Sequence, residues 1–476
     1  MRAMILFMTC AMGAGACSSE GGTSGTDPGT DTIVVQDLAQ DLAPDVAPPP
    51  TLDPVTCGQT PFQWLGADQV GEMLQWEESA MTNVTPEFLI TTIEQMGYSK
   101  SLEGMEHTVR NFRMRYTTQD KGASVEATGM VGIPTDVESD GPLPVLLWLH
   151  PTTGSNDACA PSRDPLAGPG QTSILSSLGY IAVAPDYIGM LGFGEGSPED
   201  TIHPYMVAQP TALASLDAVR ATLAWLEADP DLPKGDPTRV ILWGGSQGGH
   251  ACFVTERYQP YYAPELNIIA VAAAIPGTDL LAMAEHGATY WSDTSRGLTA
   301  VLTAMHAWFG LGDLADALTD EAPNFIASSA PGIMAGECGA SSLFSGIDSV
   351  AGVYSEAFLA AAQAGTLGDF EPWGCFLKES SVDRMSVPRV SDVPFLATFG
   401  ELDDLAQTSV ELEAMVRYCA QGYRIEYHNC AGLGHVETAA ATLPYMARWT
   451  ADRLSGKEWD PAVVCSDSEP IDCDTL

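Results

Sequence analysis

Short apolar runs alternate with helical stretches along most of this chain, and this alternation restricts its fold more than any other feature. Two alternating segments, 107–117 and 123–133, predict an antiparallel pair of strands. Continuous apolar runs of strand length follow at 144–150, 180–184, 240–243, 268–275, 394–399 and, in a shorter form, 424–428. Helical patterns lie between them, notably at 211–228, 408–420 and 436–454. Strands alternating with helices predict a mostly parallel sheet with helices on both faces.

One segment interrupts the alternation. Between 279 and 388 there is no strong strand pattern, and short Ala-rich helical pieces appear instead, such as 297–309 and 353–364. An insertion of this length between two strands of a regular sheet predicts a helical cap.

The chain contains a single G-x-S-x-G motif, which places Ser246 between an apolar run and a helical stretch. A nucleophile on a sharp strand-to-helix turn needs small neighbours two positions before and after it, and Gly244 and Gly248 supply them. The helix that follows directs its unpaired N–H groups and positive dipole end toward the serine. A plain Gly-rich turn is the simpler interpretation in a chain with 46 glycines. The strand before and the helix after favour a nucleophile.

A serine hydroxyl needs a base, and the base needs a carboxylate to orient it. In hydrolases with this turn the partners follow in the order Ser, Asp or Glu, His. The apolar run at 394–399 ends in Gly-Glu-Leu-Asp-Asp, which places a carboxylate at the edge of the sheet where ligands bind. We predict Asp403 as this acid. Asp404 is the alternative, or caps the helix that follows.

One of the five histidines after Ser246 fits the base. Of the other four, His250 lies on the helix after the serine, and His428 lies within a strand pattern. His286 and His306 precede the acid in the sequence. His435 follows a flexible Ala-Gly-Leu-Gly loop and precedes a helix, where a base can reach Ser246. We therefore predict His435 as the base.

An oxyanion hole needs two N–H donors. The backbone of Gln247, directly after the serine, supplies one. The other is expected in the loop after the run at 144–150, but Pro151 has no N–H. The second donor is therefore assigned to Thr152 or Thr153.

Several motifs occur together in this order: Cys-Ala-Pro-Ser at 159–162, Ala-Pro-Asp-Tyr-Ile-Gly at 184–189, His-Pro-Tyr at 203–205, Trp-Gly-Gly-Ser-Gln-Gly-Gly at 243–249, Gly-x-x-Asp at 400–403 and Gly-His at 434–435. With these motifs the chain resembles the secretory lipase (lipase A-like) family over about residues 80–455. The resemblance implies an α/β-hydrolase fold with a mostly parallel sheet and an inserted helical cap. It also implies carboxylic ester cleavage through an acyl-enzyme, without a metal or organic cofactor.

The resemblance further implies that Cys159 forms a disulfide with the cap, at Cys338 or Cys375. Asp186 and His203, within the shared motifs, are expected to hold loops near the site rather than to react. The cap's apolar residues either line an acyl pocket or pack the cap onto the core, and packing is favoured for each of them: Leu298, Leu302, Met305, Trp308, Phe309 and Leu311.

Two other functions stay open. A serine peptidase of the prolyl-peptidase type uses the same turn and triad, although no propeller-like repeat precedes the domain here. A non-catalytic surface-binding protein is the second alternative, and the complete Ser-Asp-His set argues against it.

The N-terminus predicts export. Arg2 precedes an apolar stretch, and small residues lead to Cys17, as at a bacterial lipoprotein cleavage site, although Ala14 stands where that pattern has Leu. Cleavage near Ala16 without lipidation is the alternative. We expect a signal peptide at 1–16, an acidic Gly/Ser/Pro-rich tether at 17–56, a hydrolase core at 57–278 and 389–476, and the cap at 279–388. The protein is then a surface or outer-membrane lipoprotein, or otherwise secreted.

Charge and cysteines limit the partners. The 62 acidic and 20 basic residues give a net charge of −42, which argues against nucleic acid and against membrane binding other than through the lipid anchor. A small-molecule or lipid ester is the expected partner. Of 11 cysteines, Cys10 and Cys17 belong to the leader and Cys252 is predicted as a buried free thiol, which leaves eight for four disulfides. No zinc-site spacing occurs, so no metal is predicted.

Overall fold

A computed structural model describes residues 50–95, 102–137, 141–197, 201–322, 347–466 and 469–476. The predicted signal peptide, Cys17, most of the predicted tether and Cys338 lie outside these ranges. Within them, no helix combines the length and the apolar character needed to cross a membrane.

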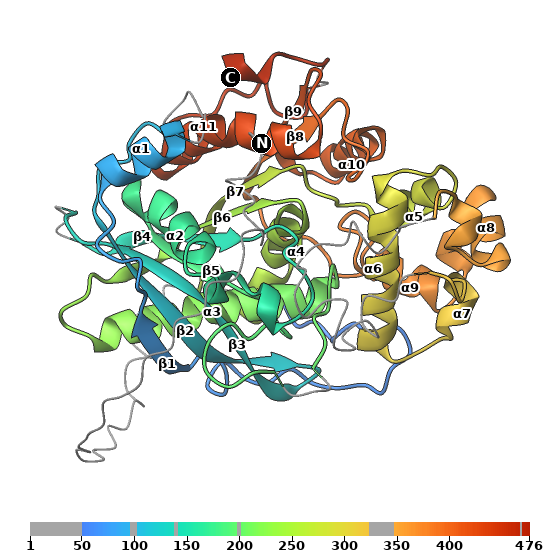
Figure 1. Ribbon diagram of the computed structural model, residues 1–476, viewed down its shortest axis with the longest axis horizontal. Coiled ribbons are helices and arrows are strands. Elements are labelled where there is room, and N and C mark those ends of the chain that lie inside the picture. Colours follow the sequence, from blue (N-terminus) through green and yellow to red (C-terminus); the bar gives the residue numbers. More distant parts are fainter. Residues whose placement is uncertain (1–49, 96–101, 138–140, 198–200, 323–346, 467–468) are drawn as a thin grey trace.

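A nine-stranded sheet in the order β1-β2-β3-β5-β4-β6-β7-β8-β9 forms the centre of the molecule (Figure 1). Its strands are β1 (Met73–Glu78), β2 (Val109–Asp120), β3 (Ala123–Pro134), β4 (Leu143–Leu149), β5 (Ile181–Pro185), β6 (Gly235–Gly245), β7 (Ile268–Ala274), β8 (Pro394–Gly400) and β9 (Arg424–Cys430). The pairs from β1 to β5 are antiparallel, and all pairs from β5 to β9 are parallel. The predicted opening hairpin and the parallel strands are confirmed.

The central strands are buried because both of their faces are covered. Side chains alternate along β4, so Val145 and Leu147 join one apolar cluster while Leu146 and Trp148 join the other. A strand buried on both faces reads as a continuous apolar run, which is why the sequence pattern located it.

Six helices form the two outer layers: α1 (Pro86–Gln95), α2 (Ala167–Ser177), α3 (Ala208–Ala228), α4 (Gln247–Tyr262), α10 (Thr408–Ala420) and α11 (His435–Leu454). Helices α3, α4 and α10 contribute to the first apolar cluster, and α1, α2 and α11 contribute to the second. Leu52 and Val55 also pack against the first cluster, so the last residues of the predicted tether are part of the packed structure.

Among the described residues between β7 and β8, five more α-helices gather at one side of the sheet (Figure 1). They are α5 (Leu280–Gly287), α6 (Asp293–Phe309), α7 (Leu314–Ala317), α8 (Glu356–Gln363) and α9 (Trp373–Glu379). They share an apolar cluster of their own, which also includes Met206 and Val207 from the chain before α3. These five helices are called the cap helices below.

Strand β1 and helices α1 and α2 were not predicted. All six residues of β1 are exposed or half-buried at the edge of the sheet, so the strand carries no continuous apolar run. Helix α2 includes Gly168, Pro169 and Gly170, which are poor helix formers in the absence of tertiary contacts.

The described disulfides are Cys57–Cys375, Cys419–Cys465 and Cys430–Cys473. Cys252 is a buried free thiol, as predicted. Cys159 is disulfide-bonded, but Cys375 pairs with Cys57. The alternative that joined Cys159 to Cys375 is therefore wrong.

Candidate functional site

Ser246 lies at a sharp turn between β6 and α4. Its backbone has φ 55° and ψ −117°, which is unfavourable for a residue with a side chain. A Cβ on Gly244 would lie 2.2 Å from the Gly248 carbonyl oxygen, and a Cβ on Gly248 would lie 1.8 Å from that of Leu149. Only glycine fits at these two positions, so the motif permits the turn that projects Ser246 from the edge of the sheet.

The structure brings the three predicted site residues together. The Oγ of Ser246 lies 2.8 Å from Nε2 of His435, and Nδ1 of His435 lies 2.7 Å from Oδ2 of Asp403. Because an ionised carboxylate only accepts hydrogen bonds, Nδ1 carries the proton and Nε2 is free to accept from the serine. The buried Asp403 also accepts from the backbone N–H groups of Leu405 and Ala406, which orient its carboxylate.

The alternative acid does not join this array. The side chain of Asp404 is exposed, and its carbonyl oxygen accepts from Thr294. It does not cap the next helix either, because the residue before α10 is Gln407.

The four histidines that were set aside have other surroundings. His250 contacts the Ser380 carbonyl oxygen through Nε2, and His428 lies 2.8 Å from Glu426 in β9. His286 and His306 lie on α5 and α6, among the cap helices.

The proposed oxyanion donors are Gln247, directly after the serine, and Thr152 or Thr153, in the loop after β4. Gln247 is the first residue of α4, and N–H groups in the first turn of a helix have no partner within it. The Oγ1 of Thr152 lies 2.8 Å from the hydroxyl of Tyr205. The hydroxyl of Thr153 is buried and has no hydrogen-bond partner among the described residues.

A buried polar contact beside the serine was not predicted. His203 faces the Ile188 carbonyl oxygen with Nδ1, so its Nε2 accepts from the Gln247 side-chain amide at 3.0 Å. Burial lowers the pKa of His203 to about 4 and keeps the ring neutral. The His-Pro-Tyr motif at 203–205 was the only signal of this contact in the sequence.

Asp186, in the Ala-Pro-Asp-Tyr-Ile-Gly motif at 184–189, is fully buried. It accepts from the Ser162 backbone N–H and from the hydroxyl groups of Ser162 and Thr128. Burial raises the pKa of Asp186 to about 6. These contacts hold two loops together and place no group on the serine.

A cavity of about 50 Å³ lies against Ser246 and His435. Its wall is mostly apolar. The cap helices α5 and α6 contribute Leu280, Met283, Leu298 and Val301, and Leu405 follows the acid. Of the six apolar residues singled out in the sequence, Leu298 lines this cavity. Leu302, Met305, Trp308 and Phe309 are buried in the cap cluster.

The described residues contain no cluster of three or more His, Cys, Asp or Glu side chains arranged to hold a metal ion. The groups that the described structure places at the site are the Ser246 hydroxyl, the His435 imidazole and the Asp403 carboxylate.

Comparisons of sequence relate the chain to lipases. Residues 171–305 match the profile of the family described as Secretory lipase. A secreted triacylglycerol lipase of Malassezia globosa is 30% identical over 203 residues, which cover 40% of each chain. Lipase 4 of Candida albicans is 24% identical over 309 residues, covering 60% of this chain and 59% of that protein. The matches thus span less than two thirds of either relative, and they confirm the resemblance to the secretory lipase family.

Comparisons of structure confirm the fold class. The rice cell wall degrading esterase LipA of Xanthomonas oryzae superimposes with a TM-score of 0.62 at 19% identity, covering 82% of this chain and 99% of that one. Candida antarctica lipase A in its closed state gives a TM-score of 0.59 at 15% identity, covering 84% and 85%. The chain therefore has the α/β-hydrolase fold.

Proposed function

Starting from this relation to the secretory lipase family, we propose that the chain is a serine carboxylic ester hydrolase that works through an acyl-enzyme. The observation that carries the proposal is the continuous hydrogen-bonded series from Ser246 through His435 to Asp403. Ser246 also has an unfavourable backbone conformation, and backbone strain of this kind is concentrated at functional sites.

In the first half of the reaction, Oγ of Ser246 attacks the ester carbonyl carbon while Nε2 of His435 takes its proton. The carbonyl oxygen becomes an oxyanion. When the tetrahedral intermediate collapses, the C–O bond to the alcohol breaks and His435 returns the proton to the leaving oxygen. In the second half, water attacks the acyl-enzyme by the same route and releases the acid. Asp403 stays ionised and stabilises the imidazolium in both halves.

Two donors would stabilise the oxyanion. The backbone N–H of Gln247 points from the first turn of α4, where the helix dipole adds to it. Thr153 is the better of the two candidates for the second donor, since the Thr152 hydroxyl already contacts Tyr205. The buried Thr153 hydroxyl has no partner in the described part of the chain, so this hydroxyl remains able to donate.

The substrate is proposed to be a lipid or other apolar ester. The cavity beside Ser246 is walled by aliphatic side chains of α5 and α6, which favours an acyl chain over a charged group. The secreted triacylglycerol lipase among the relatives points to the same class. We propose that residues 279–388 act as the cap that sets acyl specificity, and that the protein is exported and lipidated at Cys17.

The proposal is tested by Ser246→Ala, with Ser409→Ala, an exposed serine on α10, as the matched control. We expect Ser246→Ala to abolish hydrolysis of p-nitrophenyl esters and labelling by a fluorophosphonate probe, and Ser409→Ala to leave both unchanged. Full labelling and activity in Ser246→Ala would refute the proposal. Absence of labelling in the unmodified protein would favour a non-catalytic binding protein, and preferential cleavage of prolyl peptides would favour the peptidase.

A further inference from the structure

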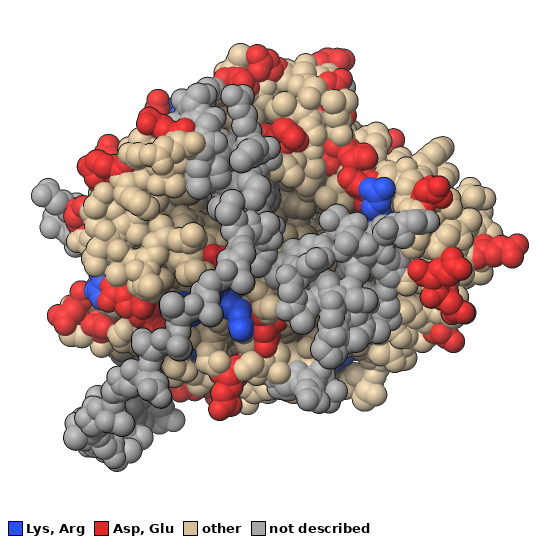
Figure 2. Space-filling view, in the orientation of Figure 1, with Lys and Arg blue, Asp and Glu red and all other residues tan. Residues whose placement is uncertain are grey.

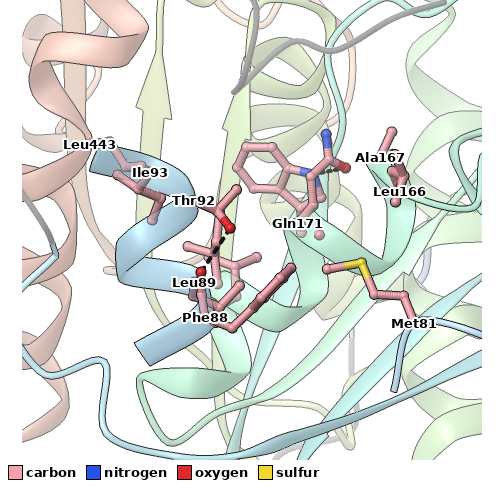
Figure 3. Close-up of a pocket in the computed structure, with 13 residues that line it drawn as sticks. Met81, Phe88, Leu89, Thr92, Ile93, Leu166, Ala167, Gln171 and Leu443 are labelled. Atoms are coloured by element: carbon pink, nitrogen blue, oxygen red, sulfur yellow. Dashed lines mark hydrogen bonds between the residues drawn. The ribbon is translucent and has the colours of Figure 1, made fainter. Parts of the chain in front are cut away.

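A second apolar cavity, of about 290 Å³, is lined by residues of α1, α2 and α11 (Figure 3). These helices pack on the face of the sheet opposite to the face that α3 and α4 cover. It shares no lining residue with the cavity at Ser246. Its size is about twice that of a ~150 Å³ apolar cavity that takes up benzene. It therefore offers room for a ligand that the proposed reaction does not use.

The walls of this cavity are aliphatic and aromatic. Leu89 and Ile93 come from α1, Ile174 from α2, Leu443 from α11 and Trp148 from β4. A Cβ built on Gly170, in the second turn of α2, would have no heavy atom within 4 Å, so the glycine leaves the cavity wider than alanine would. Glycine inside a helix costs about 1 kcal/mol relative to alanine, and no close neighbour compensates for that cost here.

Large apolar side chains flank the opening. Phe88 is 54% exposed and Leu166 is 63% exposed, and both line the cavity (Figure 3). They are two of the few large hydrophobic side chains that the described surface exposes. An aliphatic chain entering between them would cover apolar surface both inside the cavity and at its mouth.

The polar side chains in the wall leave one group free. The Thr92 hydroxyl donates to the Phe88 carbonyl oxygen at 2.7 Å, and Oε1 of Gln171 accepts from the Trp148 indole at 3.1 Å (Figure 3). The N–H₂ group of Gln171 has no partner among the described residues. One amide donor therefore stays available to a hydrogen-bond acceptor on a ligand.

Charge selects against an anionic ligand. The cavity wall contains no Lys, Arg, His, Asp or Glu. The chain carries a net charge of −42, and acidic side chains outnumber basic ones over the face in Figure 2. A carboxylate would meet no cation in this cavity and would be repelled by the surrounding field.

We propose that this cavity is a second binding site, separate from the reactive serine, for the single acyl chain of a neutral lipid such as a monoacylglycerol. The acyl chain of the lipid lies between α1 and α2, and an ester or hydroxyl oxygen of the lipid headgroup accepts a hydrogen bond from the Gln171 amide. The proposal does not depend on Ser246 being catalytic.

The test measures binding of 1-monolauroylglycerol to the full chain carrying Ser246→Ala, which prevents turnover if the protein hydrolyses the ligand. Gly170→Leu extends a side chain into the cavity from a position where a Cβ would have no heavy atom within 4 Å. Thr91→Leu adds the same side chain at an exposed position on α1 outside the cavity wall and serves as the matched control. Leu298→Trp fills the cavity at Ser246 instead. Calorimetric titration and native mass spectrometry give affinity and stoichiometry.

We expect Gly170→Leu to weaken one binding event by about tenfold or more, and Thr91→Leu and Leu298→Trp to leave that event unchanged. Gln171→Glu keeps the acceptor for Trp148 but replaces the free donor by a charge, so it should weaken the same event without filling the cavity. Laurate at pH 8 should bind more weakly than the neutral lipid. Three results would each overturn the proposal. The first is equal affinity of Gly170→Leu and Thr91→Leu for monolauroylglycerol, and the second is tighter binding of laurate than of monolauroylglycerol. The third is self-association of the protein that persists when monolauroylglycerol is added.

Discussion

The backbone N–H and the hydroxyl of Thr294 both donate to the carbonyl oxygen of Asp404, over 2.8 and 2.7 Å. The same hydroxyl lies 2.9 Å from the Leu405 carbonyl oxygen. Thr294 is the second residue of the cap helix α6, and the two acceptors directly follow Asp403. The cap helix that walls the small cavity is thus bonded to the loop that carries the proposed acid.

Replacement of Thr294 by valine should disturb the site through this loop. Valine keeps the shape of threonine and its backbone N–H but removes both hydrogen bonds of the hydroxyl. Loss of these bonds should lower the free energy of unfolding by about 1–2 kcal/mol. We expect a lower midpoint of thermal unfolding and a several-fold lower kcat/KM on p-nitrophenyl esters. Both are measured on the purified variant.

Thr299→Val is the matched control for this change. Thr299 is also buried on α6, but its hydroxyl donates to the Arg296 carbonyl oxygen of the same helix. It should alter stability to a similar degree and leave kcat/KM near that of the unmodified protein. An equal loss of kcat/KM in the two variants would show that the contact with the acid loop has no special effect.

Asp403→Asn should separate catalysis from folding. The asparagine oxygen still accepts from the Leu405 and Ala406 N–H groups, but an amide cannot stabilise an imidazolium as a carboxylate does. We expect kcat to fall by about 10³–10⁴-fold with little change in unfolding temperature. Asp404→Asn, at an exposed side chain, should retain activity. The reverse order of these two effects would make Asp404 the acid.

The proposed site was accessible from the sequence because its signals are local and ordered. The turn at Ser246 needs glycine at fixed positions, and the acid and base follow the ends of β8 and β9 in the expected order. Buried strands were located for a similar reason, since each is a continuous apolar run. The exposed edge strand β1 carries no such run and was missed.

Contacts between distant segments were not accessible in the same way. The bond between Thr294 and Asp404 joins residues that are 110 positions apart, and Gln247 and His203 are 44 apart. No periodicity or spacing in the chain encodes which polar side chains meet after folding. The pairing of Cys57 with Cys375 is of the same kind.

Glu411 should make stability depend on pH. Its fully buried carboxyl group accepts from the Thr278 N–H and hydroxyl, and burial raises its pKa from the ordinary 4.5 to about 8. Between these two values the folded chain holds a proton that the unfolded chain releases. The contribution of Glu411 to the free energy of unfolding is therefore complete below pH 4.5. It is lost as the pH rises to about 8, by up to about 1.4 kcal/mol per pH unit.

Denaturant unfolding at several pH values measures this contribution as the difference between the unmodified protein and Glu411→Gln. The amide cannot titrate, so the variant should lose less stability between pH 5 and 8, whatever its stability at pH 5. Parallel pH profiles for the two proteins would mean that Glu411 is ionised in the folded state throughout this range.

The disulfide between Cys57 and Cys375 should hold the cap helices to the core. It links the chain before β1 to α9 across 318 residues, and nearby the Gln59 amide donates to the Trp308 and Phe309 carbonyl oxygens at the end of α6. A disulfide that closes a longer loop removes more entropy from the unfolded chain. We expect Cys57→Ser with Cys375→Ser to lower the free energy of unfolding by about 2–5 kcal/mol.

Cys419→Ser with Cys465→Ser is the matched comparison, because that disulfide spans only 46 residues and joins α10 to the C-terminal segment. It should cost about 1–2 kcal/mol less, by the logarithmic dependence on loop length. Hydrogen exchange distinguishes the two further: loss of the Cys57–Cys375 bond should speed exchange in α6 and α9, while loss of the other should speed it in α10 and β9. Unchanged exchange in α6 and α9 without the Cys57–Cys375 bond would show that apolar packing alone holds the cap helices in place.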